Sequence, residues 1–246
     1  MPATSNSISS TASSDLRFLG GGRAVGLTLV RRRGVRGMRL AVDPRDGSVR
    51  LTLAPRAPLK PALAWATEKR AWVEAQLERL PQPQPIVPGM SFALSDGHVR
   101  LEWDAGAGRT PQLADGVLTV GGPRELLAPR VLRFLRAHAL RLLEAETRAL
   151  ATAHGIAIGR VGVGDPRGRW GSCASSGDIR YSWRLILAPG FVRRATVAHE
   201  VAHRVHMDHS ARFWSLARAL LGESHAPAGA WLKAHGTALH WFGREG

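Results

Sequence analysis

Short stretches of alternating hydrophobic and polar residues dominate the first part of the chain, and this period of two predicts strands. The stretches cover residues 24–33, 38–42 and 49–53. Glycines separate the first two, and a Pro-Arg-Asp-Gly turn separates the last two. The pattern therefore predicts a small N-terminal β meander.

Residues 59–80 have the period of an amphipathic helix, with Trp65 and Trp72 expected in its core-facing stripe. Four prolines in residues 81–88 predict a break. Four further short strands, separated by glycine-containing turns, are expected at residues 91–94, 99–103, 111–113 and 117–120.

The second half of the chain is predicted to be mainly helical. A long helix is expected over residues 124–154, with Leu132, Leu135, Ala139 and Leu142 in its buried stripe. After a strand at 156–163, residues 169–173 and 178–187 read as a hairpin. Helices are expected from Pro189-Gly190 to about residue 206, over 211–221 with Ser210 as N-cap, and over 227–235.

These elements predict the α+β class, with an N-terminal β meander and helix followed by a helical region with a small sheet. The Ser/Thr-rich residues 1–16 are expected to be a disordered tail. We divide the remainder into a β-rich region, 17–120, and a catalytic region, 121–246, which could also form one continuous domain over 17–240.

Composition indicates the cellular compartment and the possible partners. The single cysteine, Cys173, excludes an internal disulfide and suits a reducing compartment, and no stretch resembles a signal peptide or a membrane span. We therefore expect a cytoplasmic protein without a membrane partner; the sequence does not indicate its oligomeric state. The net charge of +15 allows a nucleic-acid partner, but no nucleic-acid module accompanies the arginines. We favour arginines spread over solvated faces.

Residues 199–203 form an HExxH pattern, His-Glu-Val-Ala-His. On a helix, residues four apart share a face, so His199 and His203 can bind one metal ion. Glu200 is rotated by about 100°, which places its carboxylate beside an open coordination position. Neutral nitrogen ligands, an open position and a nearby base are the requirements of metal-assisted hydrolysis.

A catalytic zinc normally has three protein ligands, so one more is needed. His209 lies too far along to share the face of His203, but a turn after the helix could return it to the metal. His206 lies near the same face, roughly one turn higher. We favour His209 over His206.

Other roles stay open from the residues alone. Tyr181, Arg180 and Arg184 are candidates to stabilise an oxyanion, and Tyr181 could equally be core. Trp170 either contacts substrate or packs under the site. A strand within 168–173 or 180–183 could pair with an extended peptide if it lies at the sheet edge.

Three segments resemble one known family: RWGSC at 169–173, YSWRLILAP at 181–189 and HEVAHRVHMDHSARFW at 199–214. The chain is similar there to YgjP-like metallopeptidases, which are related to SprT-like and WLM protease domains. The resemblance implies a zincin-like (minigluzincin) α+β catalytic domain. It also implies one zinc ion on His199, His203 and His209, with Glu200 as the base.

The main functional hypothesis is a zinc-dependent metallopeptidase that acts on a peptide or protein. Two alternatives are kept. The first is a metal-dependent nucleotide phosphohydrolase of the pyrophosphatase type, which the abundant arginines would suit, although no phosphate-binding loop is present. The second is a zinc-stabilised DNA-binding module, in which Glu200 would have no catalytic use.

Overall fold

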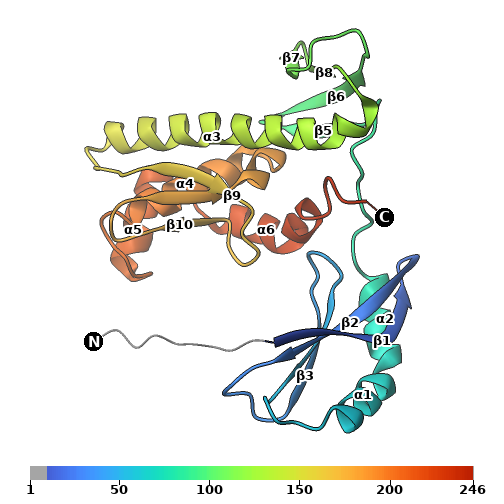
Figure 1. Cartoon of the computed structure of the whole chain (residues 1–246). Coiled ribbons are helices and arrows are strands. Elements are labelled where there is room, and N and C mark those ends of the chain that lie inside the picture. Colours follow the sequence, from blue (N-terminus) through green and yellow to red (C-terminus); the bar gives the residue numbers. More distant parts are fainter. Residues whose placement is uncertain (1–9, 246) are drawn as a thin grey trace. The chain divides into compact units, whose positions relative to one another are not determined.

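The computed structural model describes residues 10–245, which form two compact units, one up to Pro83 and one over Gln84–Glu245. The four strands around residues 91–120 belong to the second unit, together with the HExxH helix, whereas the sequence analysis grouped them with the N-terminal strands. Each unit is described separately (Figure 1).

The first unit contains a four-stranded sheet and two helices. The strands are β1 (Ser10–Gly20), β2 (Arg23–Arg31), β3 (Met38–Val42) and β4 (Val49–Leu53). Their order is β1-β2-β4-β3, and β2 pairs with β4 in parallel, so the sheet departs from the predicted simple meander. The prediction of a disordered tail is wrong from Ser10 onward, because Ser10–Gly20 pairs with β2; residues 1–9 lie outside the described part.

Two helices, α1 (Leu59–Glu68) and α2 (Arg70–Glu78), occupy the segment predicted as one helix. They are separated at Lys69, and the unit's buried cluster includes residues of β1, β2, β4 and both helices. In one continuous helix, Trp72 would share the face of Trp65, seven residues earlier. The break removes this relation: Trp65 is partly buried in the cluster, whereas Trp72 is 46% exposed, so its predicted core position is wrong.

The second unit begins with a small sheet of order β5-β6-β8-β7. Its strands are β5 (Ser91–Leu94), β6 (Gly97–Trp103), β7 (Gln112–Ala114) and β8 (Val117–Val120), close to the predicted ranges. Ion pairs join this sheet to the helices: the Arg193 guanidinium lies 3.0 Å from both Asp96 and Glu146. Because the Arg193 side chain is almost fully buried, this pairing fixes the sheet against the helix that carries the HExxH motif.

The long helix α3 (Leu127–Ala153) follows a short 3-10 turn, Arg124–Leu126, and spans nearly the predicted range. Its buried residues recur every four positions and are Leu127, Val131, Leu135, Ala139, Leu143, Thr147 and Ala151. The predicted stripe is therefore partly wrong, since Leu132 and Leu142 lie at its margin and are only partly buried.

A second small sheet and three helices pack below α3 in Figure 1. The strands are β9 (Val161–Gly164), β10 (Gly171–Cys173) and β11 (Ile179–Ser182), in the order β10-β11-β9. The helices are α4 (Gly190–Ala202), α5 (Ala211–Leu221) and α6 (Ala226–Leu239). The α+β class is confirmed. Within residues 10–245, every helix is too short or too polar to cross a bilayer.

Candidate metal centre

The HExxH motif lies at the end of α4, which stops at Ala202 rather than near residue 206 as predicted. Tight turns follow, in which the amides of Arg204 and Val205 donate to the carbonyls three residues earlier. The chain then enters α5, where the Ser210 hydroxyl accepts a hydrogen bond from the Phe213 amide, as predicted for the N-cap.

This early turn returns His209 to the helix. The Nε2 atom of His199 lies 3.2 Å from Nε2 of His203 and 3.2 Å from Nε2 of His209. Within residues 10–245, these three side chains form the only His, Cys, Asp or Glu group close enough to share a metal ion. At Zn–N distances of about 2.0–2.1 Å, neighbouring ligands of a tetrahedral ion are about 3.3 Å apart. The spacing therefore fits a small tetrahedral cation.

The backbone orients His203. Its Nδ1 atom lies 3.0 Å from the His206 carbonyl oxygen, which can only accept a hydrogen bond. Nδ1 must therefore carry the proton, and the lone pair of the neutral ring lies on Nε2, where a metal would bind. His206, the alternative third ligand, thus contributes its carbonyl. Asp208 accepts a hydrogen bond from the Ser210 amide and so belongs to the turn before α5.

The Phe213 ring supports all three histidines. It is fully buried, and its centroid lies 4.5 to 4.9 Å from the centroids of His199, His203 and His209. The ring therefore limits the rotation of all three imidazoles. No local sequence pattern indicates this contact.

We expect Phe213→Ala to lower metal affinity by about 10- to 100-fold, because the imidazoles would lose the ring that limits their rotation. Affinity is measured by competition with a chromophoric chelator. Leu220→Ala, in the same helix and also buried, is the matched control for a loss of core packing. An equal fall in affinity in both variants would contradict the role given to the Phe213 ring.

Burial controls the protonation of the site. It lowers the pKa of His199 to about 4, with further contributions from His203, His209 and His225, and it also lowers the pKa of His203. Burial raises the pKa of Glu200 to about 7, against a small opposing effect of Arg169. At neutral pH both helix imidazoles are therefore uncharged and available as ligands.

The raised pKa of Glu200 predicts a pH-dependent difference in stability in the metal-free protein. The folded state binds the Glu200 proton more tightly than the unfolded state, so this stabilisation is complete below pH 4.5 and is lost as the pH rises through about 7. We expect Glu200→Gln to match the wild type near pH 4.5 and to exceed it at pH 8 by about 3 kcal/mol. Thermal unfolding in chelator at both pH values tests this; a difference independent of pH would contradict it.

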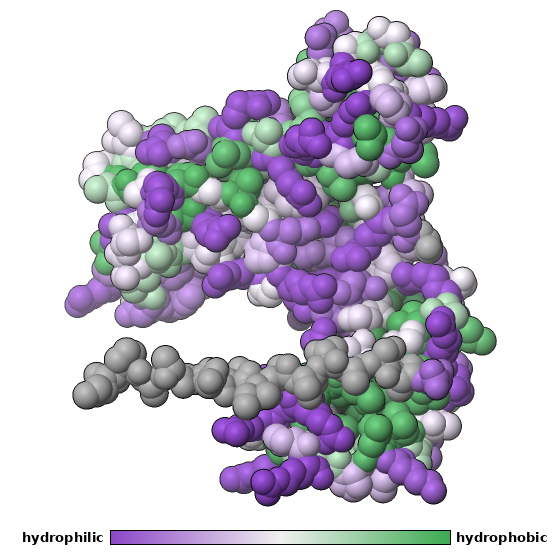
Figure 2. All heavy atoms as spheres, in the orientation of Figure 1, coloured by the Kyte–Doolittle hydropathy of each residue, from purple (hydrophilic) through white to green (hydrophobic). Residues whose placement is uncertain are grey.

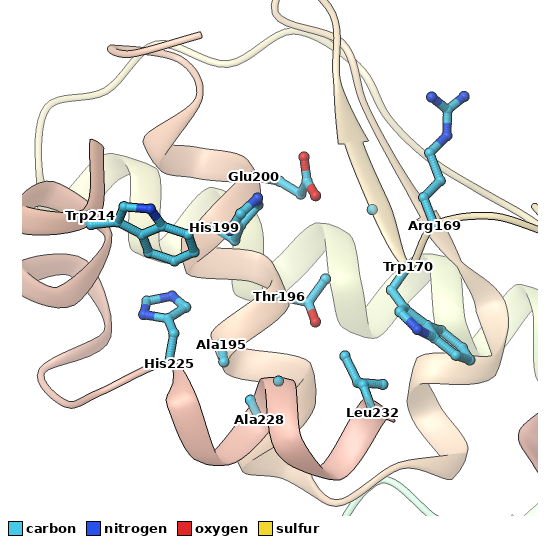
Figure 3. Close-up of a pocket in the computed structure, with 12 residues that line it drawn as sticks. Arg169, Trp170, Ala195, Thr196, His199, Glu200, Trp214, His225, Ala228 and Leu232 are labelled. Carbon is cyan, nitrogen blue, oxygen red and sulfur yellow. The ribbon is translucent and has the colours of Figure 1, made fainter. Parts of the chain in front are cut away.

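A pocket of about 340 Å³ adjoins the histidines. Figure 3 shows Glu200, His199, Thr196 and Ala195 on the α4 side of the pocket, with Trp170 and Trp214 on opposite sides. Helix α6 supplies the remaining wall, with residues His225, Ala228, Gly229 and Leu232. The site thus combines a polar corner at Glu200 with a mainly apolar wall.

Of the predicted substrate-binding residues Trp170, Tyr181 and Arg180, Trp170 lines the pocket. Tyr181 does not: it is fully buried and its hydroxyl lies 3.0 Å from the Thr147 hydroxyl, so its substrate role is corrected to a core role. Arg180 is exposed, next to Tyr181 on β11, and is absent from the pocket lining, so that prediction is corrected too. Cys173 is half-buried and outside the histidine group.

The sequence does not predict that His225 and Trp214 line the pocket. His225 lines the pocket, and its ring centroid lies 6.5 Å from that of His199. Trp214, on α5, is 43% exposed and borders the pocket. No local pattern marks either residue, because their positions depend on how α5 and α6 pack against α4.

The sheet order decides which strand could pair with a substrate. β11 is central, so residues 180–182 are already paired on both sides, whereas β10 is at an edge. The Trp170 carbonyl accepts from the Ser182 amide and the Ala174 amide donates to Asp178, so the even-numbered residues face β11. The backbone groups of Gly171 and Cys173 therefore point away from the sheet.

Comparison with known proteins identifies the protein family. The YgjP-like metallopeptidase domain model matches residues 37–235, which include β10, α4 and all three histidines. No curated protein and no solved structure matches the chain. The chain belongs to the YgjP-like metallopeptidase domain family. It is therefore a metallopeptidase, and hence a hydrolase, in its general class.

Proposed function

We propose that the protein is a zinc-dependent peptidase in which His199, His203 and His209 hold one metal ion and Glu200 is the general base. One observation carries the proposal: the Nε2 atoms of the three histidines meet beside the buried carboxylate of Glu200, which comes from the same helix as His199. Among the described residues, the Glu200 Oε2 atom has no hydrogen-bond partner. A structural metal site would have no use for such a base.

The bound metal would supply a Lewis acid that acidifies water and polarises a carbonyl. Glu200 accepts the proton of the attacking water on its unpartnered oxygen and later delivers it to the leaving amine. Its pKa, raised to about 7 by burial, suits a group that must both accept and release a proton near neutral pH.

The edge strand β10 would hold the peptide. Gly171 and Cys173 offer backbone groups for antiparallel pairing with an extended chain, and the strand runs directly beside the base. A Cβ atom at Gly171 would lie only 2.3 Å from the Glu200 Oε1 atom, so only glycine leaves this carboxylate in place. The apolar pocket wall favours a substrate with an apolar side chain near the scissile bond.

His225 is the group that we assign to the scissile carbonyl. Its Nε2 atom is buried and has no hydrogen-bond partner among the described residues, although the ring lines the pocket. In Figure 3 the ring lies beside Ala195 and below His199, whereas the Arg169 guanidinium points away. Burial lowers the pKa of His225, and the ring already donates to the Ala195 carbonyl through its other nitrogen. Nε2 would therefore donate to the developing oxyanion only in the protonated ring, which the negative charge of the oxyanion favours.

We expect His225→Ala to lower kcat about 10²- to 10³-fold while the metal content stays unchanged, because the lost donor acts on the substrate oxygen. Steady-state kinetics and metal analysis on the same preparation measure both effects. His235→Ala, an exposed histidine of α6, is the control. A loss of metal equal to the loss of activity would show that His225 instead supports the metal site.

The experiment that tests the proposed function is a peptide-library digest with products identified by mass spectrometry. Wild-type protein should generate new peptide termini, and Glu200→Gln should generate none above background. A metal-loaded wild type that cleaves no peptide would contradict the proposal.

One observation keeps the nucleotide phosphohydrolase as the second candidate: the pocket lining includes Arg169, whose guanidinium is of a type that binds phosphate, although it points away from the pocket in Figure 3. Nucleoside triphosphates should therefore be tested in parallel with the peptides. Glu200-dependent release of pyrophosphate without peptide cleavage would favour this candidate.

A further inference from the structure

The sheet of the first unit has two unlike faces. On β4, Val49, Leu51 and Leu53 are fully buried in the cluster that includes residues of α1 and α2, whereas Arg50 and Thr52 alternate with them and face the other way. Basic residues also outnumber acidic ones by more than two to one in residues 15–83. The charged residue of β4, Arg50, therefore lies on the face away from the helices.

Arginines from four segments gather on that face. On β3, Arg39 pairs with Thr52 and Ala41 pairs with Arg50, so Arg39 and Arg50 are diagonal neighbours on one side of the sheet. They border a depression of about 720 Å³. Its arginines come from two strands, the β2–β3 loop and the β3–β4 turn, and are Arg32, Arg33, Arg39, Arg45 and Arg50. Figure 2 shows hydrophilic residues gathered over the β3 part of this unit.

Little negative charge offsets this group. Arg45 pairs with Asp43 at 2.8 Å. Across residues 10–245, the side chains of Arg32, Arg33, Arg39 and Arg50 take part in no ion pair. Like charges on neighbouring strands repel, so an anion in the depression would lower the free energy of the folded unit.

We propose that this arginine face binds the sugar–phosphate backbone of double-stranded nucleic acid. Arginine presents a planar fork of donors that matches phosphate oxygens. The lining holds five arginines and one acidic residue, Asp43, and this excess of positive charge fits a polymer of phosphates. The lining contains no aromatic residue, so it offers no surface on which unpaired bases could stack. Such binding does not depend on the base sequence of the nucleic acid or on the peptidase reaction.

The test is fluorescence anisotropy of a labelled DNA duplex of about two helical turns with the full chain. Affinity should fall steeply between about 50 and 200 mM salt. The double variant Arg39→Gln/Arg50→Gln should bind about tenfold more weakly or worse at low salt, and its log–log salt slope should be shallower by about two. Its thermal midpoint should not fall, because both side chains are exposed.

The matched control is Arg133→Gln/Arg141→Gln, which removes the same charge from exposed positions of α3. An equal loss of affinity in the control would overturn the assignment to this face, as would absence of binding at low salt. Binding of an RNA duplex as well as DNA supports the backbone assignment. Tighter binding of single-stranded DNA than of duplex, or binding of polyglutamate but not of nucleic acid, would overturn it.

Discussion

Glu200→Gln is expected to lower kcat for peptide hydrolysis by about 10³-fold or more while leaving the metal content unchanged. Glutamine is nearly the same size and fills the same buried position, but it cannot accept the proton of the attacking water. The three imidazoles do not depend on this side chain for their position, since Phe213 and the His206 carbonyl orient them.

The measurement is single-turnover cleavage of a quenched fluorescent peptide selected from the library digest. Glu144→Gln, at a partly exposed glutamate of α3 that pairs with Arg148, controls for the loss of one carboxylate. Unchanged activity in Glu200→Gln would exclude this residue as the base. Loss of metal together with activity would mean that the carboxylate acts as a ligand.

Arg184→Ala is expected to lower the free energy of unfolding by about 3–5 kcal/mol. The sequence suggested Arg184 as an oxyanion donor, but its side chain is only 7% exposed and forms two hydrogen bonds with the Asp165 carboxylate, at 2.8 and 3.0 Å. It also donates to the carbonyls of Leu239 and Phe242, so it fastens the C-terminal segment to the core. Burial opposes ionisation of Asp165, but Arg184 holds its pKa below the usual range.

Denaturant unfolding measures this effect. Arg180→Ala, four residues earlier and exposed, removes the same charge and should change stability by no more than about 0.5 kcal/mol. Arg184→Lys keeps the charge but cannot form the paired hydrogen bonds, so it should lie between the two. Equal stability of the Arg184→Ala and Arg180→Ala variants would contradict the structural role of Arg184.

Local patterns predicted much of this fold because local chemistry sets it. Strands β3, β4, β5 and β8 begin and end where the alternation does. The Ser210 cap and the return of His209 follow from the short chain between two helices. The parallel pairing of β2 with β4 could not be predicted, because alternation shows which face of a strand is buried but not its neighbour.

The candidate site also contains residues that the sequence predicts and residues that it does not. The HExxH spacing places two histidines and a glutamate on one helix, so sequence alone brings them together. Trp214 and His225 reach the pocket only because α5 and α6 fold back on α4, a long-range arrangement without a sequence signal. Tyr181 and Arg184 suggested chemistry because they are polar and near the motif, yet both are buried and bonded within the core.

The proposed function requires that the three histidines hold one catalytic metal ion. The most direct measurement is the metal content of purified wild-type protein, by mass spectrometry, before and after chelation and after return of zinc. Purified wild-type protein should hold one divalent ion per chain, lose peptide cleavage when the ion is removed and regain it when the ion is returned. A folded protein that binds no divalent ion, or cleaves peptides equally without one, would contradict the proposed function.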